Sequence, residues 1–429
     1  METCGLIAEY NPFHNGHKQQ LQVIREQFGP EAGVVICLSG PFCQRGIPAL
    51  LDKGVRAHIA LSMGADLILE LPQAFAVTSA ERFAEGAVQT LLATGIVRNI
   101  AYGTEQPEQH ENIRNVAAIL ADEPPELGEI IRNHIALGTG FAAARSQALD
   151  HITGNPSLGA LLRDSNTILA VEYEKALVRY NYGATVQDNG HPAPVTTHAF
   201  PLFDKEKMSA SAIRDRIWEA LELDRGEDYL PLMRTLALLL PPASVAAVMD
   251  AVTRGKGLLF DEMIAPLFLL APVFSHLDRL KQIHGMQGGL AERLVNAFRD
   301  DPTSVLQTGT TPYETFVRSL ATRNHPASRI RRAIISAAMG IENDHNALTK
   351  IGPTYLRVLG FTKRGKRLLS FMRHTASLPT IVNTSDFRKL EDPSAIAQAK
   401  LDLHAQAVWN LHAGYPDRSE FMRDVLQAR

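Results

Sequence analysis

Short apolar runs alternate with helix-like segments through the first half of this 429-residue chain. The runs are rich in Val, Ile and Leu, which is typical of strands buried on both faces. Such alternation predicts a parallel sheet with helices on both sides. Ligands of these sheets bind beyond the carboxyl ends of the strands. The predicted strands are 4–9, 33–40, 66–72 and 96–103, the predicted helices are 17–28, 52–63 and 80–93, and the loops expected to bear the site are 9–17, 39–49 and 103–107.

The pattern changes after about Ile217. Before that point we predict a helix at 166–180, a strand at 194–200 and a helix that Ser209 caps at its N-terminus. Beyond it strand signals are few, and "FTKRGKR" at 361–367 is interpreted as a charged turn between helices. We therefore predict an α/β, Rossmann-like N-terminal domain with a parallel sheet at residues 1–222, followed by a mostly α-helical C-terminal domain at residues 223–429.

Composition favours a cytoplasmic protein without a membrane anchor. The net charge is −3, so the total gives no sign of a nucleic-acid partner. The three cysteines, an odd number without CxxC spacing, fit a reducing compartment and argue against a zinc site. The start of the chain lacks a signal-peptide pattern, and the apolar segment 263–274 is too short to cross a bilayer. No protein partner is inferred.

The stretch "GLIAEYNPFHNGHKQQL" at 5–21 carries the clearest chemical signal. His14 and His17 flank Gly16 where the first predicted strand gives way to a helix. A helix N-terminus attracts anions, and glycine permits close approach of a phosphate. Imidazole N–H groups could stabilise charge that develops on a nucleotide α-phosphate under attack. Alternatively, both histidines are surface or capping residues; a zinc site is less favoured because no third ligand stands out.

A second motif supports nucleotide binding. HxGH after the first strand of an α/β half is the signature of the HxGH nucleotidyltransferase superfamily. Its partner motif is a Ser/Thr-rich stretch ending in Ile-Arg at the start of a late helix. "SASAIR", with Ser209, Ser211 and Arg214, resembles that motif. The resemblance implies that these residues hold the triphosphate, although Arg214 could also be a solvated helix residue.

Several longer strings resemble one family, the tRNA(Met) cytidine acetate ligases. They are "GLIAEYNPFHNGH", "LSGPFCQRGIPALLDK", "GADLILELP", "YGTE", "SNTILAVEY" and "YLRVLGFTKRGKRLL", which together extend over most of the chain. The resemblance implies an enzyme that joins ATP and acetate into acetyl-adenylate. It also implies that the acetyl group then passes to N4 of the wobble cytidine of elongator tRNA(Met).

The resemblance also implies an ATP site. His14 and His17 are the expected catalytic residues. Mg²⁺ is expected with ATP, held mainly by phosphates and water. The nucleotide site would comprise Ile7, Ala8, Glu9, Tyr10, Asn11, Pro12, Phe13, His14, Asn15, Gly16, His17, Lys18, Gln19, Gln20, Gly103, Asn166, His198, Ser211 and Arg214.

Other interpretations of these residues remain open. Gly103 could be a plain turn glycine, and Asn166 could be a helix N-cap. Gln44, Arg45 and Lys53 are candidates for contacts to phosphate, acetate or RNA, and the two cations could equally be solvated.

The sequence departs from the family at several positions. The family usually has Lys-Arg on the strand before the Ser-rich motif, where this chain has Thr197-His198. His198 is a candidate for a partial replacement of the arginine, although imidazole is mostly neutral at pH 7. Ser165 and Thr167 flank Asn166 where the family has Pro-Asn-Asn.

A basic segment predicts contact with RNA. Residues 317–373 contain twelve Lys or Arg against two acids, a local charge of 12 − 2 = +10. Such a patch fits a phosphate backbone, although a solvated basic helix surface would look the same. Tyr355 and Phe361 could stack on bases, but more often such aromatics pack in a core. The predicted RNA contacts are Arg329, Arg332, Lys363, Arg364, Lys366 and Arg367.

Two other functions remain possible. A small-molecule adenylyltransferase would explain both motifs but not the basic segment. A non-catalytic RNA-binding protein with a residual nucleotide fold would explain the lost Lys-Arg pair but not the intact histidines.

Overall fold

The computed structural model describes residues 1–184, 195–202, 209–224, 228–265, 269, 276–300 and 312–428. Its centre is an eight-stranded sheet of order β10-β8-β5-β2-β1-β6-β7, with β9 paired to β8. All pairs are parallel except β5 with β8. The strands are β1 Thr3–Ala8, β2 Gly33–Ser39, β5 Leu67–Leu71, β6 Asn99–Thr104, β7 Thr196–Pro201, β8 Leu356–Phe361, β9 Thr380–Ile381 and β10 Leu426–Gln427.

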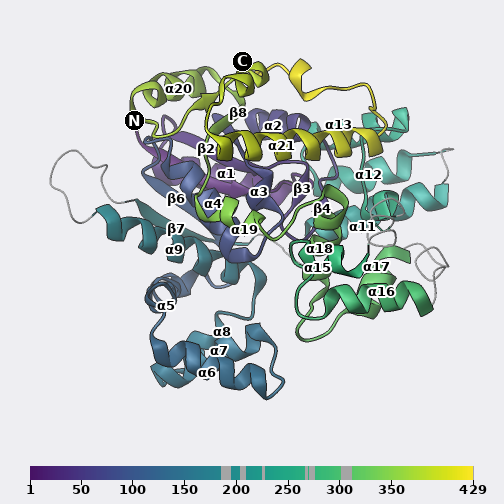
Figure 1. Ribbon diagram of the computed structural model, residues 1–429. Helices are drawn as coiled ribbons and strands as arrows, with labels where there is room; N and C mark the ends of the chain where they lie inside the picture. The colour runs from purple at the N-terminus through teal and green to yellow at the C-terminus, as the bar shows by residue number, and fades with distance from the viewer. Residues whose placement is uncertain are drawn as a thin grey trace.

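Helices cover both faces of the sheet, as the apolar strands require (Figure 1). Val34 and Ile36 of β2 pack in the core formed with α1 (Asn15–Phe28) and α2 (Lys53–Ser62). Their neighbours Val35 and Cys37 belong to the opposite core, formed with α4 (Ala80–Leu92) and α9 (Ser165–Ala184). The predicted parallel sheet and its first elements are thus confirmed. The helices of the second face are α3 Gln73–Ala76, α4 Ala80–Leu92, α5 His110–Asp122 and α9 Ser165–Ala184, with α6 Pro125–Ala136, α7 Phe141–Thr153 and α8 Pro156–Ala160 below them in Figure 1.

A two-stranded hairpin interrupts the loop between β2 and α2. Its strands are β3 (Phe42–Cys43) and β4 (Ile47–Pro48), and they pair antiparallel. Phe42 and Cys43 are fully buried. The sequence pattern of 39–49 predicts only a loop, and the structure adds the hairpin to it.

A run of helices follows β7. Ser209 accepts from the Ala212 N–H at 3.2 Å and so caps α11, as predicted. Ile213 and Ile217 of α11 extend the core on the α1 and α2 side. The helices are α11 Ala210–Asp224, α12 Leu230–Leu239, α13 Pro242–Arg254, α15 Leu277–Gln282, α16 Leu290–Asp300, α17 Pro312–Leu320, α18 Ala327–Met339 and α19 His345–Lys350.

The chain then returns to the sheet. β8 is buried along its whole length and pairs with β5, and Thr362 caps the helix that follows, α20 (Lys363–Thr375). The interpretation of 361–367 as a turn between helices was wrong, because "LRVLGF" has both faces covered and forms a strand. The sheet is therefore not confined to residues before 222, and the division at 222/223 stays a prediction. The remaining elements are α21 Pro393–His412 and the short 3₁₀ helices at Pro107–Gln109, Thr384–Lys389 and Glu420–Met422.

Within the described ranges, no helix is long and apolar enough to span a bilayer. The segment 263–274 lies partly outside those ranges. All three cysteines are buried and unpaired.

Candidate active site

The loop after β1 is anchored by a buried arginine of α2. Arg56 is fully buried and donates to the carbonyl oxygens of Glu9 at 2.7 Å, Ser39 at 2.9 Å and Gly40 at 2.5 Å. The guanidinium thus satisfies carbonyls at the ends of two neighbouring strands. This fixes the relative position of the β1 and β2 loops, where ligands of a parallel sheet are expected.

His14 and His17 form a reciprocal cap at the start of α1. Nδ1 of His14 accepts from the Gly16 N–H at 3.1 Å, and Nδ1 of His17 accepts from the His14 N–H at 3.2 Å. The two rings stack with centroids 3.7 Å apart. The histidines are therefore caps, and the same contacts orient both rings at the helix N-terminus.

The cap also sets the protonation state of the rings. Because each Nδ1 accepts a backbone hydrogen, the neutral ring carries its proton on Nε2. Burial lowers the pKa of His14 to about 4 and lowers that of His17 as well, where the neighbouring His14 adds to the effect. At neutral pH both rings are uncharged Nε2–H donors at the positive end of a helix. That combination suits an oxyanion or phosphate oxygen.

The Ser-rich motif meets the histidine loop through Asn11. Arg214 of α11 donates to Oδ1 of Asn11 at 3.1 Å and to the Pro48 carbonyl at 3.3 Å. The same Oδ1 accepts from the Leu50 N–H at 2.7 Å. Arg214 also pairs with Asp261 at 2.8 Å. The two motifs, some two hundred residues apart in sequence, thus share one site, whereas Ser211 of the same helix turn is exposed.

The β6 loop lies beside α1. A Cβ placed on Gly103 would lie 2.8 Å from Cδ2 of Leu202 and 3.8 Å from Nε2 of Gln20, so the position is crowded. Glu105 accepts from Nδ2 of Asn166 at 2.9 Å and from the Thr167 N–H at 2.9 Å. Asn166 therefore engages the β6 loop, and its predicted contact with the nucleotide stays a prediction.

The β3–β4 hairpin is the third part of the site. The Gln44 N–H donates to Oε1 of Glu9 at 2.6 Å. Arg45, at the hairpin tip, donates to Oγ of Ser165 at 3.2 Å. Lys53, by contrast, is buried and pairs with Glu70 at 2.7 Å, so its ammonium is committed to the protein interior.

Most other residues predicted for the nucleotide site lie in the same loop but serve packing. Tyr10 and Phe13 are buried, with ring centroids 4.6 Å apart, and Tyr10 also contacts His17. Asn15 donates to the Leu238 carbonyl at 3.2 Å. Ile7 and Ala8 end β1, Pro12 and Gly16 are buried, Lys18 and Gln20 are half-buried, and Gln19 is exposed.

Comparison with known proteins identifies the family. A family model described as HIGH Nucleotidyl Transferase matches residues 1–424. The tRNA(Met) cytidine acetate ligase of Acetivibrio thermocellus is 33% identical over 416 residues, 95% of this chain and 94% of that protein. Its counterpart in Thermotoga maritima is 34% identical over 388 residues, 89% of this chain and 87% of that protein. The chain belongs to the tRNA(Met) cytidine acetate ligase family.

Solved structures agree with this membership. A crystal structure of Thermotoga maritima TmcAL bound with alpha-thio ATP matches with a TM-score of 0.87 at 30% identity, covering 100% of this chain and 99% of that one. The apo crystal structure of the same protein matches with the same TM-score and covers 100% of both chains. The predicted fold and family resemblance are confirmed.

His198, which the family resemblance assigns to the nucleotide site, lies away from the histidine pair in the fold. His198 of β7 contacts Gln27 at 3.0 Å and Asn99 at 3.0 Å, and its ring packs against Phe28. Gln27 is ten residues after His17 on α1, which is about 15 Å along a helix. The structure therefore does not bring His198 to the histidine pair, because His198 faces the far end of α1.

The predicted RNA contacts of this ligase-family chain fall into two groups. Arg329 and Arg332 lie on α18, whose backbone packs against Gly46 of the hairpin. α20 begins beside Asp66, at the amino end of β5 and thus on the opposite edge of the sheet. Within α20, Lys363, Lys366 and Arg367 are exposed, whereas Arg364 pairs with Asp66 at 3.3 Å. The aromatic side chains of Tyr355 and Phe361 are buried.

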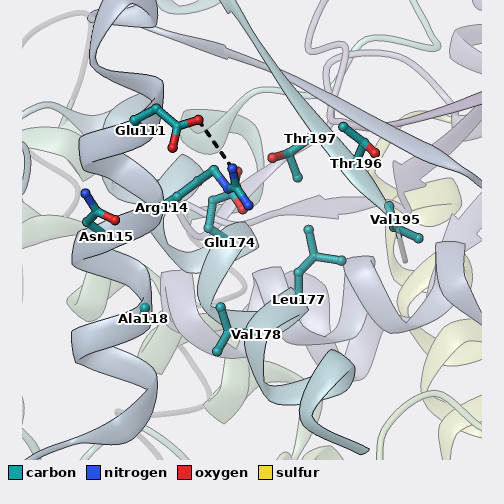
Figure 2. A pocket seen from close by; sticks show the side chains of 10 residues that line it. All are labelled: Glu111, Arg114, Asn115, Ala118, Glu174, Leu177, Val178, Val195, Thr196 and Thr197. Atoms are coloured by element: carbon teal, nitrogen blue, oxygen red, sulfur yellow. Dashed lines mark hydrogen bonds and ion pairs between the residues drawn. The ribbon is translucent and has the colours of Figure 1, made fainter. Parts of the chain in front are cut away.

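A separate cavity of about 500 Å³ lies between α5, α9 and β7 (Figure 2). Glu174 at its wall accepts from Tyr102 Oη at 2.6 Å, and Thr196 and Thr197 line the opposite side. Because Thr196 pairs with Asn99 at the start of β6, this cavity lies away from the carboxyl ends of the strands. It is not part of the histidine site.

Sequence reasoning missed Arg56 and the hairpin contact to Glu9. Arg56 lies within the apolar helical segment "VRAHIAL". A cationic side chain in such a segment is expected to be buried and to donate hydrogen bonds to other parts of the protein. The hairpin contact uses a backbone N–H, for which no sequence signal exists.

Proposed function

We propose that this chain is an ATP-dependent ligase that activates acetate as acetyl-adenylate and acetylates N4 of the wobble cytidine of elongator tRNA(Met). The observation that carries the proposal is the pair of neutral, stacked imidazoles at the N-terminus of α1, with both Nε2–H groups available to an anion. Family membership and the likeness to a crystal structure bound with alpha-thio ATP support ATP as the substrate.

The first step is displacement at the α-phosphate. An acetate oxygen attacks phosphorus, the bond to the β-phosphate oxygen breaks, and pyrophosphate leaves. Negative charge builds on the phosphate oxygens, and Nε2–H groups of His14 and His17 donate to them. Arg214 lies beside this loop and supplies positive charge for the triphosphate.

Mg²⁺ accompanies the nucleotide in this proposal. In the described part of the chain, no three or more His, Cys, Asp or Glu side chains converge on one metal position. The residues present therefore fit an ion held mainly by phosphate oxygens and water, which is the usual binding mode of Mg²⁺ with nucleotides. The ion would neutralise phosphate charge.

The second step is acyl transfer to tRNA. The N4 amine of cytidine attacks the carbonyl carbon of acetyl-adenylate, and AMP leaves. The basic residues of α18 and α20 would bind the tRNA backbone. We place this reaction in the cytoplasm, where the three unpaired cysteines stay reduced.

A product assay tests the proposal. The purified protein is incubated with ATP, Mg²⁺, labelled acetate and unmodified tRNA(Met), and the digested RNA is examined for N4-acetylcytidine. Label in that nucleoside supports the ligase. Transfer of AMP to a phosphorylated metabolite instead, or tRNA binding with no acyl chemistry, would favour one of the two alternative functions.

A further inference from the structure

We propose that the side-chain carboxylate of Glu9 accepts the proton that cytidine N4 loses when it takes the acetyl group. This inference rests on the proposed function and adds the base for its second step. Glu9 follows β1 directly and shares its loop with the histidine pair.

The chemistry of the second step requires a base. As N4 attacks, a C–N bond forms and the carbonyl becomes tetrahedral, with positive charge on nitrogen. The proton leaves nitrogen for Oε2 of Glu9, the carbonyl reforms, and the C–O bond to phosphate breaks with its electron pair going to AMP. A positioned general base accelerates such a transfer by about 10²–10⁴-fold.

The two histidines cannot fill this role. Each Nδ1 is already occupied by a backbone hydrogen, and each neutral ring holds its proton on Nε2. A second proton would make the ring cationic and would displace a backbone N–H from the helix cap. His14 and His17 therefore donate hydrogen bonds and do not accept the proton.

Glu9 has the geometry that a base requires. Oε1 is fixed by the Gln44 N–H at 2.6 Å, and among the described residues no group is bonded to Oε2. The backbone of Glu9 is fixed in turn by Arg56 at 2.7 Å. One carboxylate oxygen is thus held while the other is left for substrate.

Neighbouring carboxylates are committed to the protein. They are held by cations or by several donors: Glu70 by Lys53, Asp52 by Arg423, Asp261 by Arg214, and Glu105 by Asn166 and Thr167. Protonating any of these would break an ion pair or a capping contact. Glu9 forms no ion pair with a described residue.

The surroundings of Glu9 make its carboxylate a stronger base than an ordinary carboxylate. Burial raises the pKa of its carboxyl above the ordinary value, and the Gln44 N–H and nearby arginines oppose that rise in part. A base whose pKa approaches the working pH is more effective than an ordinary carboxylate. The titratable and charged groups that face it are Arg45 and Cys43 of the hairpin, Arg56 of α2, Tyr173 of α9 and Arg214 of α11.

The test separates the two steps. Activation is measured as acetate-dependent exchange of label between pyrophosphate and ATP, without tRNA. Transfer is measured in a single turnover from synthetic acetyl-adenylate to unmodified tRNA(Met). The variants are Glu9→Gln, which keeps an oxygen for the Gln44 N–H, and Glu9→Asp, which keeps the charge. The matched control is Glu81→Gln, a carboxylate of α4 that pairs with Lys175 at 2.8 Å and lies outside the histidine site.

Glu9→Gln should lower the ratio of transfer to exchange by at least about 100-fold. Glu9→Asp should restore part of it, and Glu81→Gln should leave the ratio unchanged. Transfer by the native protein should fall as pH drops below the pKa of Glu9. An unchanged ratio in Glu9→Gln overturns the proposal, as does a native transfer rate that does not fall as pH is lowered from 9 to 4, which needs no variant. Failure of the native protein to exchange label would instead refute the proposed function.

Discussion

Nη1 of Arg332 donates to the carbonyl oxygen of Gln44 at 3.2 Å. The N–H of the same Gln44 donates to Glu9, so one hairpin residue joins helix α18 to the loop that bears the histidines. Burial and the neighbouring Arg329 and Arg331 lower the pKa of Arg332 to about 10, which leaves it charged at neutral pH. The contact indicates that Arg332 supports the hairpin, whereas its role as an RNA contact stays a prediction.

Arg332→Gln should therefore slow both activation and acetyl transfer more than it weakens RNA binding, because the hairpin contacts the loop that bears the histidines and Glu9. If the poorer positioning of the loop raises the activation free energy by about 1.4 kcal/mol, acetate-dependent exchange becomes about tenfold slower. The control is Arg329→Gln, because Arg329 is on the same helix but donates to the Gln287 and Asn324 carbonyls. A normal exchange rate with weakened, less salt-dependent tRNA binding would show that Arg332 contacts phosphate instead.

Gly46→Ala should disturb the hairpin tip. Gly46 has φ +74°, and a Cβ there would lie 2.6 Å from the backbone nitrogen of Arg332. Strained backbone and overpacking together should lower the free energy of unfolding by about 2–4 kcal/mol. Gly154→Ala, with φ +63° and open space around it, should cost only about 1 kcal/mol. Equal losses in urea denaturation would mean that the hairpin and α18 do not pack as described.

The caps of α1 predict a dependence of stability on pH. The unfolded chain binds a proton on His14 near pH 6.5, whereas the folded pKa is lowered to about 4. The stabilisation by the neutral ring is complete above pH 6.5 and is lost as pH falls toward 4.

His14→Asn should therefore reduce the fall of the urea midpoint between pH 6.5 and 4, because asparagine caps a helix without titrating. It should also slow exchange by about 10²–10³-fold, since an Nε2–H donor is removed. A variant as pH-sensitive as the native protein would show that His14 is protonated normally in the fold.

The exposed face of α20 should contribute to tRNA affinity without affecting activation. Replacing Lys363, Lys366 and Arg367 together by Gln should reduce the slope of log affinity against log salt by about 2, if each contacts one phosphate. Acetate-dependent exchange should stay normal, because α20 lies at the opposite edge of the sheet from His14. The control is Arg364→Gln, which removes the pair with Asp66 and should lower stability while keeping the salt slope.

The sequence predicted the core of the sheet well because β1, β2, β5 and β6 are apolar runs between amphipathic helices. It missed β8 as a strand because "LRVLGF" follows a long helical region and pairs with β5, almost three hundred residues earlier. The local sequence pattern of a strand does not show which distant strand it pairs with.

The histidine pair and Arg214 could be located from motifs, since their chemistry is carried by side chains at fixed spacing. His198 could not be placed from its position before the Ser-rich motif, because strand register decides which end of α1 it faces. The contacts of Glu9 and Arg332 with Gln44 involve backbone atoms, which every residue possesses. Tertiary structure alone reveals them.

The most direct test of the account is acetate-dependent exchange between labelled pyrophosphate and ATP, measured without tRNA for the native protein and for His17→Ala. Exchange of label between pyrophosphate and ATP should require acetate and should fall by about 10²–10³-fold in the variant. Absence of exchange from folded native protein that binds ATP would contradict activation of acetate at this site, and undiminished exchange in His17→Ala would contradict the role of the imidazole pair.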